Sequence, residues 1–93
     1  MSKDYSKIRE MLEAQESFPF DYIHKVIGRN TPAFLDSVAA LESRFPAVRR
    51  DSLRPSASQA HVSVTLVLRA ADASEVIRLL EATEALVDLV MVL

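Results

Sequence analysis

The sequence predicts an α+β domain in which strand, helix, strand, strand, helix and strand follow one another. Two observations support it: two segments repeat apolar residues at helical spacing, and the segments around them alternate apolar and polar residues as strands do. This order is the split βαβ plan, in which two crossover units share one sheet. We therefore expect a βαββαβ sandwich with a four-stranded antiparallel sheet in the order 4-1-3-2, both helices on one face, and a short N-terminal helix.

Two central strands carry the clearest alternation. Phe20 to Ile27 predicts the first strand, which Gly28 is expected to end at a turn or bulge. His61 to Arg69 predicts the third strand, with Val62, Val64, Leu66 and Leu68 on one face. A strand with a single apolar face belongs to a sheet that is packed on one side only.

The two outer strands are less regular in sequence. Val48 to Arg54 is rich in arginine, which is typical of an edge strand that avoids pairing with other chains. Leu86 to Leu93 is expected to close the sheet.

Local signals define the two helices that should pack on this sheet. Thr31 followed by Pro32 is a typical helix start, and Pro46 ends a helix over Pro32 to Arg44. Its apolar stripe consists of Phe34, Leu35, Val38, Leu41 and Phe45. Asp72 and Glu75 resemble a capping box for the second helix, whose stripe is Val76, Leu79, Leu80 and Thr83.

Length and composition indicate one soluble domain. The 93 residues divide into an N-terminal extension over 1–17, helical from Tyr5 to Gln15, and one domain over 18–93. The sequence has no cysteine, so we expect neither disulfides nor thiolate metal sites. We also expect no secretory leader. No apolar segment approaches the roughly 20 residues that a membrane-spanning helix needs. We expect a cytoplasmic protein without a membrane partner. A net charge of -2 argues against a nucleic-acid partner.

Several short motifs resemble one known family. They are Phe18-Pro19, Lys25-Val26-Ile27-Gly28, Arg54-Pro55-Ser56, Ser63-Val64-Thr65 and Val90-Met91-Val92-Leu93. In order and spacing they are similar to the YbeD-like family of small bacterial proteins, over Phe18 to Leu93. The resemblance implies a ferredoxin-like fold similar to ACT regulatory domains and implies no catalytic residues. The chain departs from the family pattern because its second hairpin lacks the expected glycine and His61 replaces an expected tyrosine.

The residues do not assemble a recognisable catalytic or metal site. No serine lies in the glycine-flanked strand-to-helix turn that a nucleophile needs, and Gly28 alone cannot form the phosphate cradle of an acylphosphatase-like hydrolase. That hydrolase is the remote alternative. His24 and His61 have no evident carboxylate or cysteine partner, so we expect a packed His24, an exposed His61, and neither metal nor other cofactor.

Nucleic-acid recognition has little support either. The third strand shows no aromatic side chains on which bases could stack. The arginines Arg44, Arg49, Arg50 and Arg54 could contact phosphates, but Asp51 interrupts them, so protection of an edge strand is the favoured interpretation.

The leading functional hypothesis is a regulatory or protein-interaction module without catalytic activity. The alternative is an ACT-like sensor that binds an anionic ligand where a helix begins, at Gly28, Arg29, Asn30 and Thr31. Against it, Ala33 occupies the position after the proline where amino-acid-binding ACT domains carry glycine.

An apolar outer sheet face is the main sign of a partner. The alternation places Ile23, Ile27, Val67, Val90 and Val92 on the face away from the helices. Ile27, Val67, Val90 and Val92 are the candidate interaction residues. We expect the N-terminal helix or a second copy in a homodimer to cover them, and an unidentified protein partner as the third choice.

Overall fold

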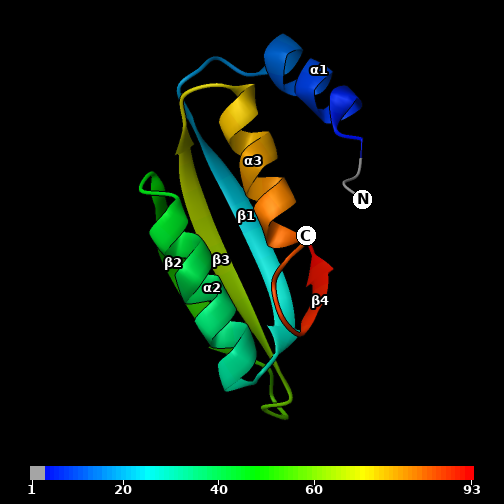
Figure 1. The fold of residues 1–93 in the computed structure, drawn as a ribbon, viewed down its shortest axis with the longest axis vertical. Helices are drawn as coiled ribbons and strands as arrows, with labels where there is room; N and C mark the ends of the chain where they lie inside the picture. Colours follow the sequence, from blue (N-terminus) through cyan, green and yellow to red (C-terminus); the bar gives the residue numbers. More distant parts are fainter. Residues whose placement is uncertain (1–3) are drawn as a thin grey trace.

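A computed structural model describes residues 4–93 and shows an open sheet with helices on one side (Figure 1). The elements are α1 (Ser6–Gln15), β1 (Phe20–Arg29), α2 (Pro32–Arg44), β2 (Val48–Pro55), β3 (His61–Ala70), α3 (Ala73–Thr83) and β4 (Leu89–Val92). The first three residues of the expected N-terminal extension lie outside the described part of the chain.

The four strands form one antiparallel sheet in the order β2-β3-β1-β4. Counted from the other edge, this order is β4-β1-β3-β2. The two long central strands, β1 and β3, pair without interruption from Phe20 opposite Ala70 to Arg29 opposite His61. Helices α2 and α3 both lie over the same face of the sheet (Figure 1).

The core lies between that face and the two helices, as the alternation predicted. From the sheet it contains Val26, Val62, Val64, Leu66 and Leu68, and from the helices Phe34, Val38, Leu41, Val76 and Leu79. Burying a side chain of this size stabilises a fold by about 1.5–3 kcal/mol. The inward face of β3 is therefore confirmed.

Side-chain caps begin both core helices. Thr31 Oγ1 accepts a hydrogen bond from the Phe34 amide at 3.1 Å, which confirms the predicted start of α2. Asp72 accepts from the Glu75 amide at 3.0 Å. The Glu75 carboxylate accepts from the amide of Ala71, at 3.2 Å, so the return bond of the expected capping box falls one residue earlier.

Gly28 lies beside a register shift between β1 and β4, which fits the expected bulge, but it does not end β1 as predicted. The strand continues to Arg29, and Gly28 is buried inside it. A Cβ at this position would lie 2.4 Å from the ring of Phe34. The only glycine of the chain is thus required because the first turn of α2 packs against the backbone here.

The β2–β3 hairpin turns without glycine. Gln59 adopts a left-handed conformation with φ 65°, which usually favours glycine. Its amide donates to the Ser56 carbonyl at 2.9 Å, and its carbonyl accepts from Asn30 Nδ2 at 3.0 Å. These bonds hold the residue in a conformation that its side chain disfavours.

The last strand is shorter than predicted, and its side chains lie on other faces of the sheet than predicted. It spans only Leu89–Val92, and its register against β1 shifts between Ile27 and Gly28. Beyond this bulge Val92 pairs with Val26 and shares its helix-side face, while Met91 pairs with Ile27. The outward placement of Val92 was wrong because one extra residue reverses the alternation.

The outer face is less open at its centre than the sequence suggests. Val67 lies on this face but is only 4% exposed, since Ile23 and Arg49 stand directly opposite it on the neighbouring strands. It offers little surface to a partner. Ile23, at 60% exposed, and the half-buried Ile27 remain accessible.

Helix α1 does not cover the outer face, so this part of the prediction was wrong. It lies beside α3, on the helical side of the molecule (Figure 1). Arg9 donates to Ser74 Oγ at 3.0 Å, and the Tyr5 hydroxyl donates to the Glu84 carboxylate. Burial and this carboxylate raise the pKa of Tyr5 to about 12, so the hydroxyl keeps the proton that it donates.

Candidate functional site

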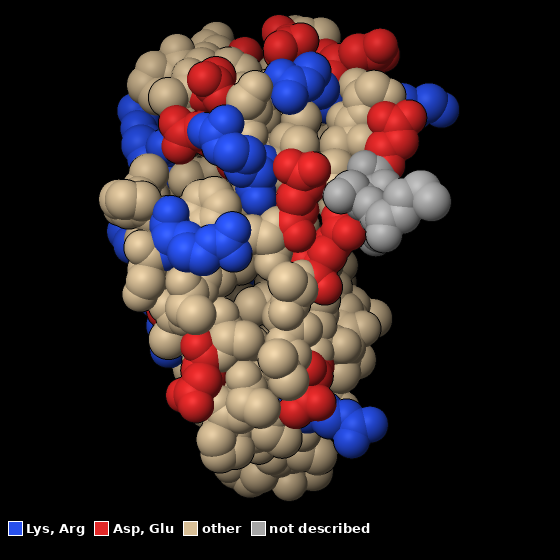
Figure 2. All heavy atoms as spheres, viewed as in Figure 1, with Lys and Arg blue, Asp and Glu red and all other residues tan. Residues whose placement is uncertain are grey.

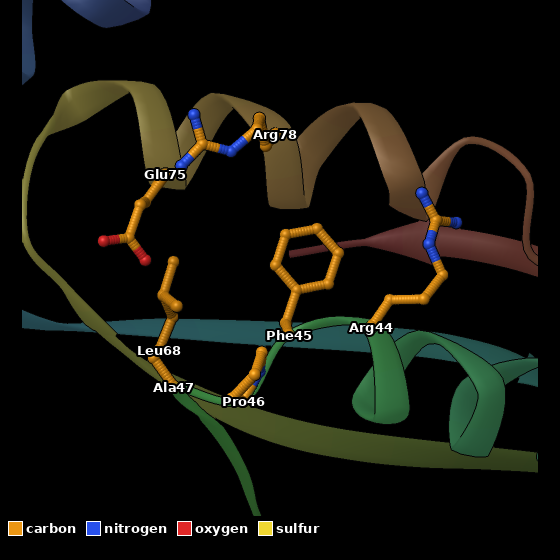
Figure 3. A pocket seen from close by; sticks show the side chains of 7 residues that line it. All are labelled: Arg44, Phe45, Pro46, Ala47, Leu68, Glu75 and Arg78. Atoms are coloured by element: carbon orange, nitrogen blue, oxygen red, sulfur yellow. The ribbon is translucent and has the colours of Figure 1, made fainter.

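A groove lies between the C-terminal end of α2 and helix α3 (Figure 3). Its volume is about 400 Å³, and it is lined by Arg44, Phe45, Pro46, Ala47, Leu68, Glu75 and Arg78. A second hollow of about 340 Å³ shares Arg44, Phe45 and Arg78 with it and continues along α3. The two hollows together form one groove, which we call the Arg44–Arg78 groove.

The end of α2 forms one wall of this groove. The helix stops after Arg44 because Phe45 leaves the helical conformation and Pro46 follows. The Phe45 carbonyl then accepts from the Val48 amide at 2.9 Å, which turns the chain into β2. The half-buried Phe45 ring packs against the core, and Arg44 occupies the last turn, where a cation suits the helix dipole.

Two arginines reach the groove from opposite walls. Arg44 projects from α2 and Arg78 from α3, with the Phe45 ring between them (Figure 3). Within residues 4–93 neither forms an ion pair, whereas Arg9, Arg49, Arg50 and Arg69 each do. Lys and Arg side chains gather over this half of the helical side, interspersed with acidic ones (Figure 2).

Two arginines of the edge strand β2 bind carboxylates of the chain, unlike Arg44 and Arg78. Arg50 donates from two nitrogens to the Glu42 carboxylate at 2.8 and 2.9 Å, and Arg49 lies 3.5 Å from Asp51. Both are bound to carboxylates of the same chain. The four-arginine cluster considered from the sequence is therefore divided, and only Arg44 belongs to the groove.

This arrangement suits an anionic group that is joined to an apolar one. A guanidinium binds carboxylate or phosphate oxygens through two parallel hydrogen bonds, and an aromatic ring accepts an apolar side chain beside it. Glu75 and Glu81 also line the two hollows. An anion is therefore attracted to the two guanidinium groups and not to the groove as a whole. The Glu75 carboxylate is already bound to the Ala71 amide.

The loop proposed as an anion site is satisfied within the chain. The amides of Asn30 and Thr31 donate to the carbonyls of Ala60 and Arg29 at 3.1 and 2.8 Å. Thr31 Oγ1 donates to the Asp88 carboxylate at 2.8 Å, which places a negative charge at this helix start. Gly28 is buried and Arg29 exposed. The four residues lie together, but these two amides are not free for a ligand.

The candidate interaction residues do not form one patch. Ile27 lies on the outer face beside Met91, whereas Val92 faces a small hollow that Tyr5 and Ile8 also line. Val90 is the extra residue at the bulge and is 52% exposed.

His24 is packed among aromatic side chains, as expected. Its ring stacks on Tyr22 with the centroids 5.9 Å apart, and Nε2 lies 2.9 Å from Thr83 Oγ1. Because the Thr83 hydroxyl donates to the Leu79 carbonyl at 2.7 Å, His24 Nε2 must be the donor to Thr83. His24 Nδ1 has no partner, and burial lowers the pKa of His24 to about 4.

Both side chains of this pair are buried, with His24 0% and Thr83 2% exposed, and both line the small hollow that Tyr5, Ile8 and Val92 share. His61 lies far along the antiparallel ladder, opposite Arg29. In the part of the chain that the structure describes, no three His, Cys, Asp or Glu side chains could hold a metal ion together. None of the helices described is both long and apolar enough for a bilayer.

Sequence reasoning missed the Arg44–Arg78 groove. Arg44 was grouped with the arginines of β2, and Phe45 with the core stripe of its helix. The available signal was local and weak: Arg78 is a basic residue of α3 that lies outside its apolar stripe. Only the packing of α2 beside α3 brings the three residues together.

One family model matches most of the chain. Residues 13–93 match the model of a family described as "Protein of unknown function (DUF493)". The match covers the whole sheet and both core helices. No curated protein matches the chain.

Proposed function

We propose a non-catalytic binding role for this chain, which belongs to the DUF493 family and so confirms the YbeD-like resemblance of its sequence. The role is that of a small cytoplasmic regulatory or protein-interaction module on a ferredoxin-like, ACT-like sandwich. The alternation of strands and helices and the uninterrupted β1–β3 ladder support that fold assignment. A cysteine-free composition is compatible with the reducing cytoplasm.

The observation that carries the proposal is the pair of arginines in the groove. Arg44 and Arg78 flank a half-buried aromatic ring and have no carboxylate partner among the described residues. We assign the groove to an acidic segment of a partner protein. Its carboxylates would bind the two guanidinium groups, and a neighbouring apolar side chain would lie against Phe45.

The expected strength of this contact is moderate. A hydrogen bond to a charged group contributes about 1.5–3 kcal/mol to the binding free energy. Because both arginines are exposed, we expect each to contribute the lower of these values. Removing either guanidinium should therefore weaken binding by about tenfold. Added salt should weaken it as well, because screening acts strongly on exposed charges.

Fluorescence anisotropy tests the proposal. The probe is a labelled decapeptide with four glutamates around one leucine, and its glutamine counterpart is the ligand control. Arg44→Gln and Arg78→Gln should each raise the Kd about tenfold. Arg29→Gln is the matched protein control, since it removes an exposed arginine from the alternative anion-binding loop.

Three results would contradict this assignment. One is equal binding of the glutamate and glutamine peptides. Another is loss of binding only with Arg29→Gln, which would favour the loop sensor instead. The third is steady hydrolysis of acetyl phosphate by the chain, which would favour the hydrolase.

A further inference from the structure

A small hollow lies between helix α1, helix α3 and the β4 side of the sheet, on the helical side of the molecule (Figure 1). Its volume is about 160 Å³. The pairing of β4 with β1 reaches no further than Lys25, so no described strand lies beside His24 on that side. None of the lining residues belongs to the Arg44–Arg78 groove, and we call this space the His24 hollow. Its apolar lining consists of Ile8, Leu80, Leu89 and Val92.

One polar side chain in the wall of this hollow has an unpaired atom. The His24 ring lines the hollow, and its Nε2 donates to Thr83 because the Thr83 hydroxyl donates to the Leu79 carbonyl. A neutral histidine with its proton on Nε2 has an acceptor at Nδ1. Within residues 4–93 this Nδ1 is the one buried side-chain nitrogen or oxygen without a hydrogen-bond partner. A buried acceptor is destabilising until a donor reaches it.

The charges around the hollow favour an uncharged ligand. The Glu84 carboxylate lines the hollow and accepts from the Tyr5 hydroxyl, so it would repel an anion, and a cation would compete with that hydroxyl. Burial without a paired charge disfavours any ion. Burial also lowers the pKa of His24 to about 4, so at pH 7 its Nδ1 is an acceptor. A fitting ligand is therefore neutral and donates one hydrogen bond.

The size of the hollow suits one six-membered ring. An engineered apolar cavity of about 150 Å³ binds benzene, and the His24 hollow has nearly the same volume. We propose that the hollow binds a small neutral aromatic alcohol, whose hydroxyl donates to His24 Nδ1 and whose ring lies among the apolar side chains. This site goes beyond the partner groove of the proposed function, since the two share no lining residue.

Helix α1 is the wall that can move to admit such a ligand. None of its residues is buried, and Tyr5 and Arg9 each connect this segment to α3 or its C-terminal end by one side-chain hydrogen bond. An element with few buried contacts opens at a low free-energy cost. The sheet and α3 belong to the core and form the other walls. A ring bound beside Ile8 would add apolar contacts that hold α1 in place.

Histidine ¹⁵N signals test the contact directly, because the chain has only two histidines. The probe is phenol at pH 7, which should shift the Nδ1 signal of His24 as that nitrogen gains a hydrogen bond. Toluene has nearly the same shape without the donor and should leave this signal almost unchanged. The exposed His61 is the internal control and should respond to neither molecule.

Two tryptophan variants of β4 test the location of the site. Val92 lines the hollow and is 43% exposed, so Val92→Trp should fill the space and raise the Kd for phenol at least tenfold in a folded chain. Val90→Trp is the matched control, at a 52% exposed position of the same strand outside the hollow, and should leave the Kd unchanged. No shift of His24 Nδ1 at millimolar phenol would overturn the proposal. Equal shifts of both histidines, or equal effects of the two variants, would overturn it as well.

Discussion

Acid should destabilise the folded chain through His24. The ring is 0% exposed, its Nε2 donates to Thr83, and its Nδ1 has no partner. A proton on Nδ1 would bury a positive charge without a compensating group. Burial accordingly lowers the pKa of His24 from 6.5 to about 4.

The sign and size of the effect follow from that shift. Between pH 6.5 and about 4 the unfolded chain binds a proton at His24 that the folded chain does not, so stability falls as the pH falls. The contribution is fully present above pH 6.5. Two and a half pKa units correspond to about 3 kcal/mol, of which about 2 kcal/mol should be lost between pH 7 and pH 5.

Urea unfolding at pH 7 and pH 5 measures this loss. Carboxyl groups also titrate near pH 5, so the informative quantity is the difference between the natural chain and His24→Leu, which should lack this part of the pH dependence. His61→Gln, at an exposed position, should behave as the natural chain does. If His24→Leu lost as much stability on acidification as the natural chain, the interpretation of His24 as a buried neutral histidine would fail.

Three further substitutions test the packing. Gly28→Ala should cost about 1–3 kcal/mol because its Cβ would meet the Phe34 ring, and Phe34→Leu in the same chain should reduce that cost in a double-mutant cycle. Leu66→Ala should cost about 2–5 kcal/mol in urea unfolding while Ser63→Ala costs little, and equal midpoints would contradict the facing of β3. Gln59→Gly should raise the melting temperature by relieving its left-handed conformation; a fall would show that the side chain contributes more than its backbone strain costs.

The parts of the fold that depend on local chemistry were predictable. Helix α2 was expected over Pro32 to Arg44 and is found there, because Thr31, Pro32 and Pro46 act on their own segment of backbone. The alternation of β3 likewise defines its two faces. Such signals need no knowledge of the partner elements.

The features that depend on another element were not predictable. The bulge opposite Gly28 arises only when β4 pairs with β1, and it reverses the facing of Val92. Gly28 was expected to end its strand at a turn or bulge, since nothing near it in sequence reveals that Phe34 packs on its backbone. The groove was missed for the same reason: Arg44 and Arg78 meet only after both helices pack.

Chemical-shift mapping of the acidic decapeptide onto the ¹⁵N-labelled chain tests the central claim most directly. The Arg44–Arg78 groove predicts that perturbed amides cluster at Arg44, Phe45 and Ala47 and over residues 75–82, together with the side-chain Nε–H signals of Arg44 and Arg78. They should be absent with the glutamine peptide. Shifts confined to Gly28–Thr31, or no shifts at millimolar peptide, would contradict the claim that this groove is the binding site.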